Sequence, residues 1–210
     1  MKKSRLPGEK SNWWRFLVAI PILVVFLAPF YILLSVAFRS PQDLSSYWAF
    51  PTQLNLENFR NAIEEGKILL SIFNSLVVTV GAVLLVTVVG ALAAYPLARR
   101  KTRLNMGIKG FVLGIMMVPP LSILVSLYSV LVKINGVNEY WGIILVLVTF
   151  ELPLSIFLYT NFISSIPKAL DEAAAIDGSG PVRTFFQIIL PQLKPVTASV
   201  VILTGVHCWN

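Results

Sequence analysis

The sequence predicts an all-α protein that crosses a membrane several times as a polytopic bundle of transmembrane helices. Hydrophobic residues make up 56% of the 210 residues and charged residues only 13%, whereas about 25% of the residues in a typical soluble domain are charged. The apolar residues are gathered in runs long enough to cross a hydrocarbon core about 30 Å thick. Because the chain has a single cysteine, Cys208, we expect no disulfide framework and no multi-cysteine metal site.

The first third of the chain is predicted to contain a tail, a membrane span and an external loop. Residues 1–15 form a basic tail. The apolar run at residues 16–38 is interpreted as the first span, because the apolar region of a signal peptide covers only about 7–15 residues. Residues 39–69 are polar and rich in turn residues, so we assign them to an extracytoplasmic loop. Within this loop, residues 56–65 can form a short amphipathic helix at the membrane surface.

Residues 70–210 are predicted to form the core of the bundle. Its first three spans are expected at about residues 70–97, 108–132 and 140–163. We expect the second of these to be broken at Pro119-Pro120 and the third to be interrupted at Pro153. After a polar stretch at about residues 165–195, residues 196–210 begin a fifth span. Because about 20 residues are needed to cross a bilayer, this span is expected to be truncated.

The polar stretch is predicted to form two short helices that meet at a bend. Pro167 suits the first turn of a helix, where a missing N–H has no intrahelical partner anyway. Gly178 can adopt the positive φ that often follows the end of a helix. Ser179 and Pro181 repeat the pattern of a helix start, and Pro191 is expected to interrupt the second helix.

The distribution of positive charge predicts the orientation in the membrane. If alternate loops are placed on the same side, all but four of the 17 Lys and Arg residues fall in the tail, the loop after the second span and the polar stretch. The positive-inside rule then places the N-terminus and the polar stretch in the cytoplasm of a multi-pass protein of the cell (plasma or inner) membrane. Basic residues beside membrane spans explain the net charge of +7, so no nucleic acid is expected as a partner.

Eight residues of the polar stretch form a pattern of defined spacing: Glu172, Ala173, Ala174, Asp177, Gly178, Phe185, Leu190 and Pro191. They resemble the EAA loop of ABC importer permeases. Ile166-Pro167 and Leu170 extend the similarity to the carbohydrate-type subgroup, which includes maltose and multiple-sugar permeases. A plain helix-turn-helix between two spans is the alternative, but the combined spacing over the stretch favours the family.

The resemblance implies a type I ABC importer permease fold, with residues 70–210 as the core permease domain. The subunit would translocate a sugar or oligosaccharide delivered by an extracytoplasmic solute-binding protein, beside a second permease subunit and two ATP-binding subunits. The eight EAA-loop residues would contact an ATP-binding subunit. The sequence GxxxxGK[ST] is absent, so ATP would be used by a partner, and no cofactor or catalytic residue is expected in this chain. The alternatives are a permease for a polyamine or an amino acid, a non-transporting membrane scaffold and a defective fragment.

Three polar residues within the spans are candidates for the substrate pathway. Glu151 lies in the middle of an apolar run, where an ionised carboxylate facing lipid is costly. It is therefore expected to face a cavity, to hydrogen-bond near Pro153, or to form an ion pair with another helix. Asn74 and Tyr128 are weaker candidates of the same kind. His207 and Cys208 lack further ligands at a usable spacing, so we expect them to pack in the core and predict no metal site.

Overall fold

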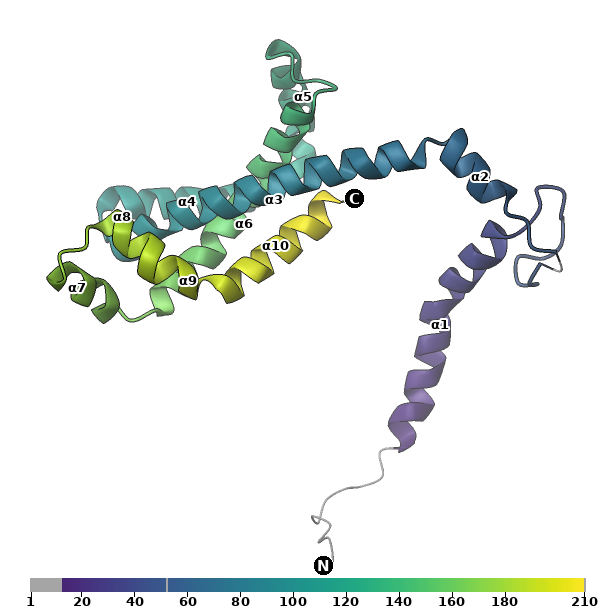
Figure 1. Cartoon of the computed structure of the whole chain (residues 1–210), viewed down its shortest axis with the longest axis horizontal. Helices are drawn as coiled ribbons and strands as arrows, with labels where there is room; N and C mark the ends of the chain where they lie inside the picture. Colours follow the sequence, from purple (N-terminus) through teal and green to yellow (C-terminus); the bar gives the residue numbers. More distant parts are fainter. Residues whose placement is uncertain (1–12, 52, 210) are drawn as a thin grey trace, which may run out of the picture. The chain divides into compact units, whose positions relative to one another are not determined.

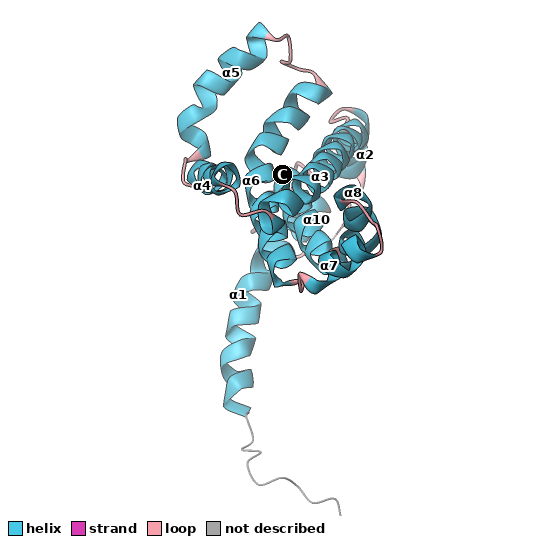
Figure 2. Ribbon diagram, turned by 90° about the vertical axis from the view of Figure 1, so that its left-hand side faces the viewer, coloured by secondary structure: helices cyan, strands magenta, loops and turns pink. Residues whose placement is uncertain are grey.

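A computed structural model describes residues 13–51 and 53–209, and the described residues form helices and connecting loops without a β-strand (Figures 1 and 2). The chain divides into two compact units, Met1–Leu70 and Ser71–Asn210. The all-helical prediction is thus confirmed for the described part of the chain. The predicted basic tail falls almost wholly outside it.

The first unit contains α1 (Trp13–Ala37) and α2 (Glu57–Glu64), joined by a long loop. The apolar side chains of α1 are largely exposed, as a helix surrounded by lipid requires. Arg39 is buried and donates hydrogen bonds to the carbonyls of Ser46 (2.9 Å) and Ala49 (2.6 Å), which fixes the loop. Helix α2 confirms the helix predicted within residues 56–65; its place at the membrane surface stays a prediction.

The second unit holds the remaining helices, apart from the first three residues of α3, which fall in the first unit. It comprises α3 (Ile68–Arg99), α4 (Arg103–Met116), a 3₁₀ turn (Pro120–Ile123), α5 (Leu124–Lys133), α6 (Tyr140–Ser165), α7 (Ala169–Ile176), α8 (Pro181–Thr184), a π turn (Phe185–Ile189), α9 (Leu190–Gln192) and α10 (Lys194–Cys208). Its core consists of buried residues from α3, α6, the π turn and α10, centred on Tyr159, Ile163 and Ile189, each 0% exposed. A buried hydrogen bond also links two of these helices: the Ser155 hydroxyl of α6 donates to the Val86 carbonyl of α3.

Among the described residues, α1, α3 and α6 are each long and apolar enough to cross a membrane. Two bent helix pairs raise the number to five if each pair is one span: α4 with the segment ending in α5, bent by 94°, and the Pro181–Gln192 segment with α10, bent by 74°. The predicted break at Pro119-Pro120 is confirmed, since the helix stops at Met116.

The expected interruption of α6 at Pro153 is wrong. The helix is continuous from Tyr140 to Ser165, and Pro153 is buried within it. A membrane helix tolerates proline where its neighbours and local adjustments satisfy the freed backbone groups.

The polar stretch forms the predicted bend, with Gly178 at φ 77° between α7 and α8. Three details differ from the prediction. Helix α7 begins only at Ala169, two residues after Pro167, and Gly180 rather than Ser179 precedes α8. The helical path also continues through Pro191, directly after the π turn. In an α-helix, the proline ring clashes with the carbonyl of the residue four positions earlier. The hydrogen bonds of a π turn span five residues, so the spacing between Pro191 and that carbonyl differs from the spacing in an α-helix.

Candidate functional site

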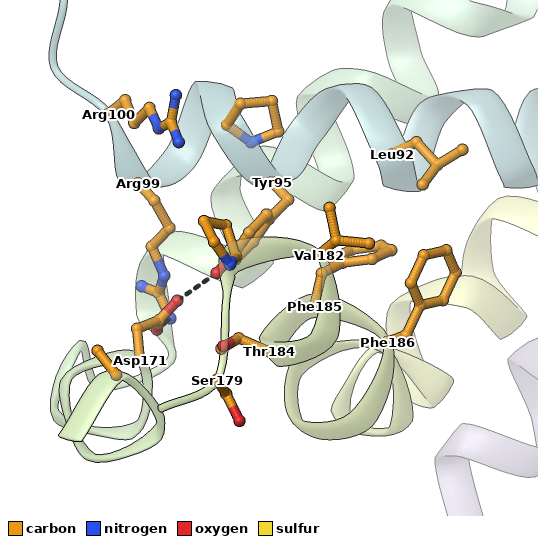
Figure 3. Close-up of a pocket in the computed structure, with 13 residues that line it drawn as sticks. Leu92, Tyr95, Arg99, Arg100, Asp171, Ser179, Val182, Thr184, Phe185 and Phe186 are labelled. Carbon is orange, nitrogen blue, oxygen red and sulfur yellow. Dashed lines mark hydrogen bonds and ion pairs between the residues drawn. The ribbon is translucent and has the colours of Figure 1, made fainter. Parts of the chain in front are cut away.

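An ion pair joins the end of α3 to the start of α7. Arg99 Nη2 lies 2.8 Å from Asp171 Oδ2, and the Tyr95 hydroxyl donates a 2.7 Å hydrogen bond to Asp171 Oδ1 (Figure 3). The Arg99 N–H groups are not aligned with Oδ2 for a hydrogen bond, so this contact is a direct attraction of charges. The side chains of Arg99 and Asp171 are only 9% and 20% exposed. Water and salt therefore screen the pair less than they screen a surface ion pair.

The same guanidinium also closes the end of α6. Arg99 Nη1 donates to the carbonyls of Ile163 (3.1 Å) and Ile166 (2.9 Å). The last carbonyls of a helix have no partner within the helix and carry partial negative charge. A single side chain thus fixes the ends of α3 and α6 against the first turn of α7.

A cavity of about 450 Å³ lies beside this ion pair, between α3 and the segment that follows α7. Figure 3 shows Leu92 and Tyr95 of α3 on one side and Val182, Phe185 and Phe186 on the other. The Tyr95 and Phe185 ring centroids are 5.2 Å apart, a spacing typical of favourable aromatic pairs. Phe185 is only 4% exposed. Phe185 therefore packs in the core and stabilises the EAA-like loop.

The outer surface of the EAA-like loop carries small, acidic and apolar groups. Glu172, Ala173, Asp177 and Gly178 are exposed, and the Ile176 side chain between them is 87% exposed. These exposed side chains are open to contact with another protein.

The eight predicted contact residues of this loop do not share one environment. Pro191 is exposed like the four named above, Leu190 is half-buried, and Ala174 and Phe185 are buried. The structure thus divides them into an outer surface and an inner support. Phe185 packs in this chain's own core and Ala174 is covered, so the surface open to a partner is smaller than the motif suggested.

The structure brings together two of the three substrate-pathway candidates. Asn74 and Tyr128 line one cavity of about 440 Å³. There the Tyr140 hydroxyl donates a 2.7 Å hydrogen bond to Asn74 Oδ1. Glu151 does not line this cavity. Its Oε1 lies 3.2 Å from His207 Nδ1 of α10, so Glu151 faces a polar side chain of another helix.

The prediction that His207 packs in the core is wrong, because its side chain is 57% exposed and faces Glu151. Cys208 is buried, as expected. No group of three or more His, Cys, Asp or Glu side chains is placed to hold a metal ion within residues 13–51 and 53–209.

Sequence reasoning missed Arg99 and Asp171 as partners, as well as the Tyr140–Asn74 and His207–Glu151 contacts. Each pair comes from two segments far apart in the chain, so no local spacing could reveal it. A partial signal was present for Arg99, which directly ends a long apolar run, and for Asp171, an acid in the loop expected on the same side of the membrane.

Comparison with known proteins agrees with this geometry. Residues 86–210 match the family model described as binding-protein-dependent transport system inner membrane component. The melibiose/raffinose/stachyose import permease of Bacillus subtilis is 41% identical over 195 residues, which covers 92% of this chain and 71% of that protein. A multiple sugar-binding transport system permease of Streptococcus mutans is 31% identical, with 96% and 74% covered.

A solved structure shares the fold. The crystal structure of a bacterial ABC transporter involved in the import of the acidic polysaccharide alginate has a chain that superimposes with a TM-score of 0.82, covering 99% of this chain and 74% of that one. The identity of 16% makes this a likeness of fold. Together with the apolar helices, these matches define a multi-pass membrane protein of a transport family rather than an enzyme family. The chain belongs to the inner-membrane components of binding-protein-dependent transport systems, the permease subunits of ABC importers.

Proposed function

We propose that this subunit translocates a sugar or oligosaccharide that an extracytoplasmic binding protein delivers. The relatives support this substrate class through their names, which specify melibiose, raffinose and stachyose, multiple sugars, and, for a 29% identical protein of Thermococcus litoralis, trehalose and maltose.

The proposed complex contains a second permease subunit and two ATP-binding subunits. The sequence lacks a Walker-type phosphate loop, so the ATP-binding subunits hold and hydrolyse ATP, and this chain carries no cofactor. The outer surface of the EAA-like loop is the proposed contact with an ATP-binding subunit. Its acidic groups Glu172 and Asp177 suit basic or hydrogen-bond-donating groups on that partner.

We propose that ATP hydrolysis is coupled to transport through α7. The single observation that carries this proposal is the position of Arg99 between three helix ends. A displacement of α7 by the ATP-binding subunit pulls on Asp171, and through Arg99 it acts on the ends of α3 and α6. Because this ion pair is largely shielded from solvent, it resists separation better than an exposed pair. Helices α3 and α6 then transmit the movement along the bundle.

The proposed orientation has the N-terminus in the cytoplasm. The Arg99–Asp171 contact places the basic segment at residues 99–103 beside the EAA-like loop. Two segments that the distribution of Lys and Arg assigned to the same side of the membrane are therefore adjacent in space, which supports the positive-inside assignment.

The test is uptake by proteoliposomes that contain the complete complex, supplied with the binding protein. We expect radiolabelled melibiose, raffinose or maltose to accumulate only when both ATP and the binding protein are present. Accumulation of none of these sugars, together with accumulation of a polyamine or an amino acid, would contradict the substrate assignment.

A further inference from the structure

A second cavity lies at the opposite end of α3 from the EAA-like loop. It has a volume of about 440 Å³ and is lined by α3, α5, α6 and the loop between α5 and α6. This volume is within the range of about 300–1,000 Å³ found for small-molecule sites. Asn74 and Arg99 are separated by about 37 Å along α3, at about 1.5 Å per residue. The cavity therefore lies near the membrane face opposite the one that binds ATP-binding subunits.

The wall formed by the loop is preformed. Asn135 and Asn138 hold positive φ angles of 55° and 63°, which asparagine adopts more readily than most residues. A Cβ added to Gly142 would collide with the Gly136 carbonyl, so the loop lies directly against the first turn of α6. A ligand that enters does not have to order this wall, and this reduces the entropic cost of binding.

The polar groups of the cavity are arranged to meet a solute with hydroxyl groups. Asn74 Oδ1 accepts from the Tyr140 hydroxyl, so the Asn74 amide can still donate to another acceptor. The Tyr128 hydroxyl makes no hydrogen bond with another described residue, and Glu139 adds a carboxylate acceptor to the lining. Val78 and Ile143 contribute an apolar surface beside the two tyrosine rings.

This lining selects between classes of solute. A purely apolar ligand would cover the Asn74 amide without offering it a hydrogen-bond partner, which is unfavourable. An anionic ligand would meet Glu139 without any Lys or Arg, because none lines the cavity. A saccharide is neither purely apolar nor anionic. Its C–H faces pack on aromatic rings, and its hydroxyl groups both donate and accept hydrogen bonds.

We propose that this cavity is a saccharide subsite within this subunit, in which Tyr128 packs against a sugar ring and Asn74 hydrogen-bonds a sugar hydroxyl. The proposal rests on the proposed function, and it adds a defined contact between this chain and the transported sugar. In the proposed orientation, the cavity lies near the membrane face at which the binding protein would release the sugar.

The first experiment measures uptake kinetics in proteoliposomes that contain the complete complex. The wild-type complex is tested with melibiose, raffinose and stachyose to select a transported sugar. We expect Tyr128→Ala and Asn74→Ala each to raise the sugar concentration for half-maximal uptake by up to about tenfold, the effect of one lost hydrogen bond or ring contact. Tyr128→Phe keeps the ring and should have a smaller effect.

The matched control is Val125→Ala, on the same helix as Tyr128. Val125 is 80% exposed and does not line the cavity, so its uptake kinetics should match the wild type. Co-purification of the partner subunits with each variant separates a loss of sugar contact from a loss of assembly. Wild-type kinetics for both Tyr128→Ala and Asn74→Ala, in a complex that transports the sugar, would overturn the subsite and leave the proposed function intact. A wild-type complex that transports none of the sugars would overturn both.

The second experiment asks what occupies the cavity. Val137→Cys places a thiol in its wall without replacing either asparagine of positive φ, while the native Cys208 is buried and gives only background labelling. We expect sugar-loaded binding protein to slow labelling of this thiol by a water-soluble maleimide during turnover, and sugar-free binding protein to leave the rate unchanged. Equal protection by sugar-free binding protein would identify a protein-docking surface. A thiol that never reacts would identify a cavity filled by lipid or by the second permease subunit. Either outcome overturns the subsite.

Discussion

Glu151 of α6 and His207 of α10 face each other, with 3.2 Å between Oε1 and Nδ1. They are 56 residues apart in the sequence, and their helices pack together in the second unit. The contact gives this carboxylate in an apolar span a polar partner on a neighbouring helix, as polar side chains within membrane spans generally have. Glu151 thus connects two helices, and it does not line either of the two large cavities described above.

We expect Glu151→Gln and His207→Gln to destabilise the protein by similar amounts, and the double variant to be no less stable than either single one. Interactions between polar side chains of membrane helices contribute about 0.6 kcal/mol on average, so the coupling free energy should be of that order. The measurement is a double-mutant cycle on unfolding in detergent micelles. Strictly additive effects would show that the two side chains do not interact.

Loss of the charge on Asp171 should weaken transport more than assembly. Asp171→Asn keeps an acceptor for the Tyr95 hydroxyl but leaves the Arg99 guanidinium buried without its counter-charge, which is strongly destabilising for a shielded pair. We expect α7 to detach from α3, so that sugar uptake falls at least tenfold while ATP hydrolysis is no longer stimulated by the loaded binding protein. The measurement is uptake and ATP hydrolysis in the same proteoliposomes.

The exposed ion pair Arg60–Glu64 on α2 provides the control for this variant. Its side chains are 73% and 59% exposed, and such pairs contribute little to stability. Glu64→Gln should therefore leave uptake unchanged. If Asp171→Asn behaves like Glu64→Gln, the ion pair has no role in coupling.

The spans and the bend could be predicted from the sequence because their signals are local. Apolar runs place α1, α3 and α6 within a few residues, and the positive φ of Gly178 follows from a glycine placed after a short helix. The continuity of α6 through Pro153 could not be predicted, because neighbouring helices decide whether a proline is tolerated. The π turn before Pro191 likewise depends on packing.

The site was less predictable than the fold. The motif located the EAA-like loop, but it could not separate exposed Glu172 from buried Phe185, since burial depends on how α3 packs against the π turn. Asn74 and Tyr128 were singled out only as polar groups in apolar runs. Their meeting in one cavity follows from the loop at residues 134–139, which brings α5 back towards α3 and α6.

The proposed orientation predicts which engineered thiols react in intact cells. Ser46 lies in the loop before α2, and Ile176 of α7 is 87% exposed. We expect a membrane-impermeant maleimide to label Ser46→Cys in intact cells, and to label Ile176→Cys only after the membrane is opened. The buried native Cys208 should stay unreactive in both cases. Labelling of Ile176→Cys from outside intact cells would reverse the orientation.

The bend at Gly178 should be intolerant of a β-branched residue because of its backbone conformation alone. A Cβ at Gly178 would meet no atom within 4 Å, yet φ is +77°, where a β-branched residue is strongly disfavoured. Gly178→Val should therefore change the angle between α7 and α8 and shift Ile176 and Asp177 on the outer surface. We expect weaker co-purification of the ATP-binding subunit and a loss of sugar uptake, with normal insertion of the chain into the membrane.

Gly180 is a closely matched control, two residues further along the same loop. It is also exposed, and an added Cβ would meet no atom within 4 Å, but its φ of −74° and ψ of 164° suit a residue with a side chain that precedes proline. Gly180→Val should retain uptake and co-purification, and Gly178→Asn should lose less than Gly178→Val because asparagine tolerates positive φ. Equal effects of valine at both positions would mean that side-chain bulk on the partner-facing surface, rather than the backbone at Gly178, limits the contact with the ATP-binding subunit.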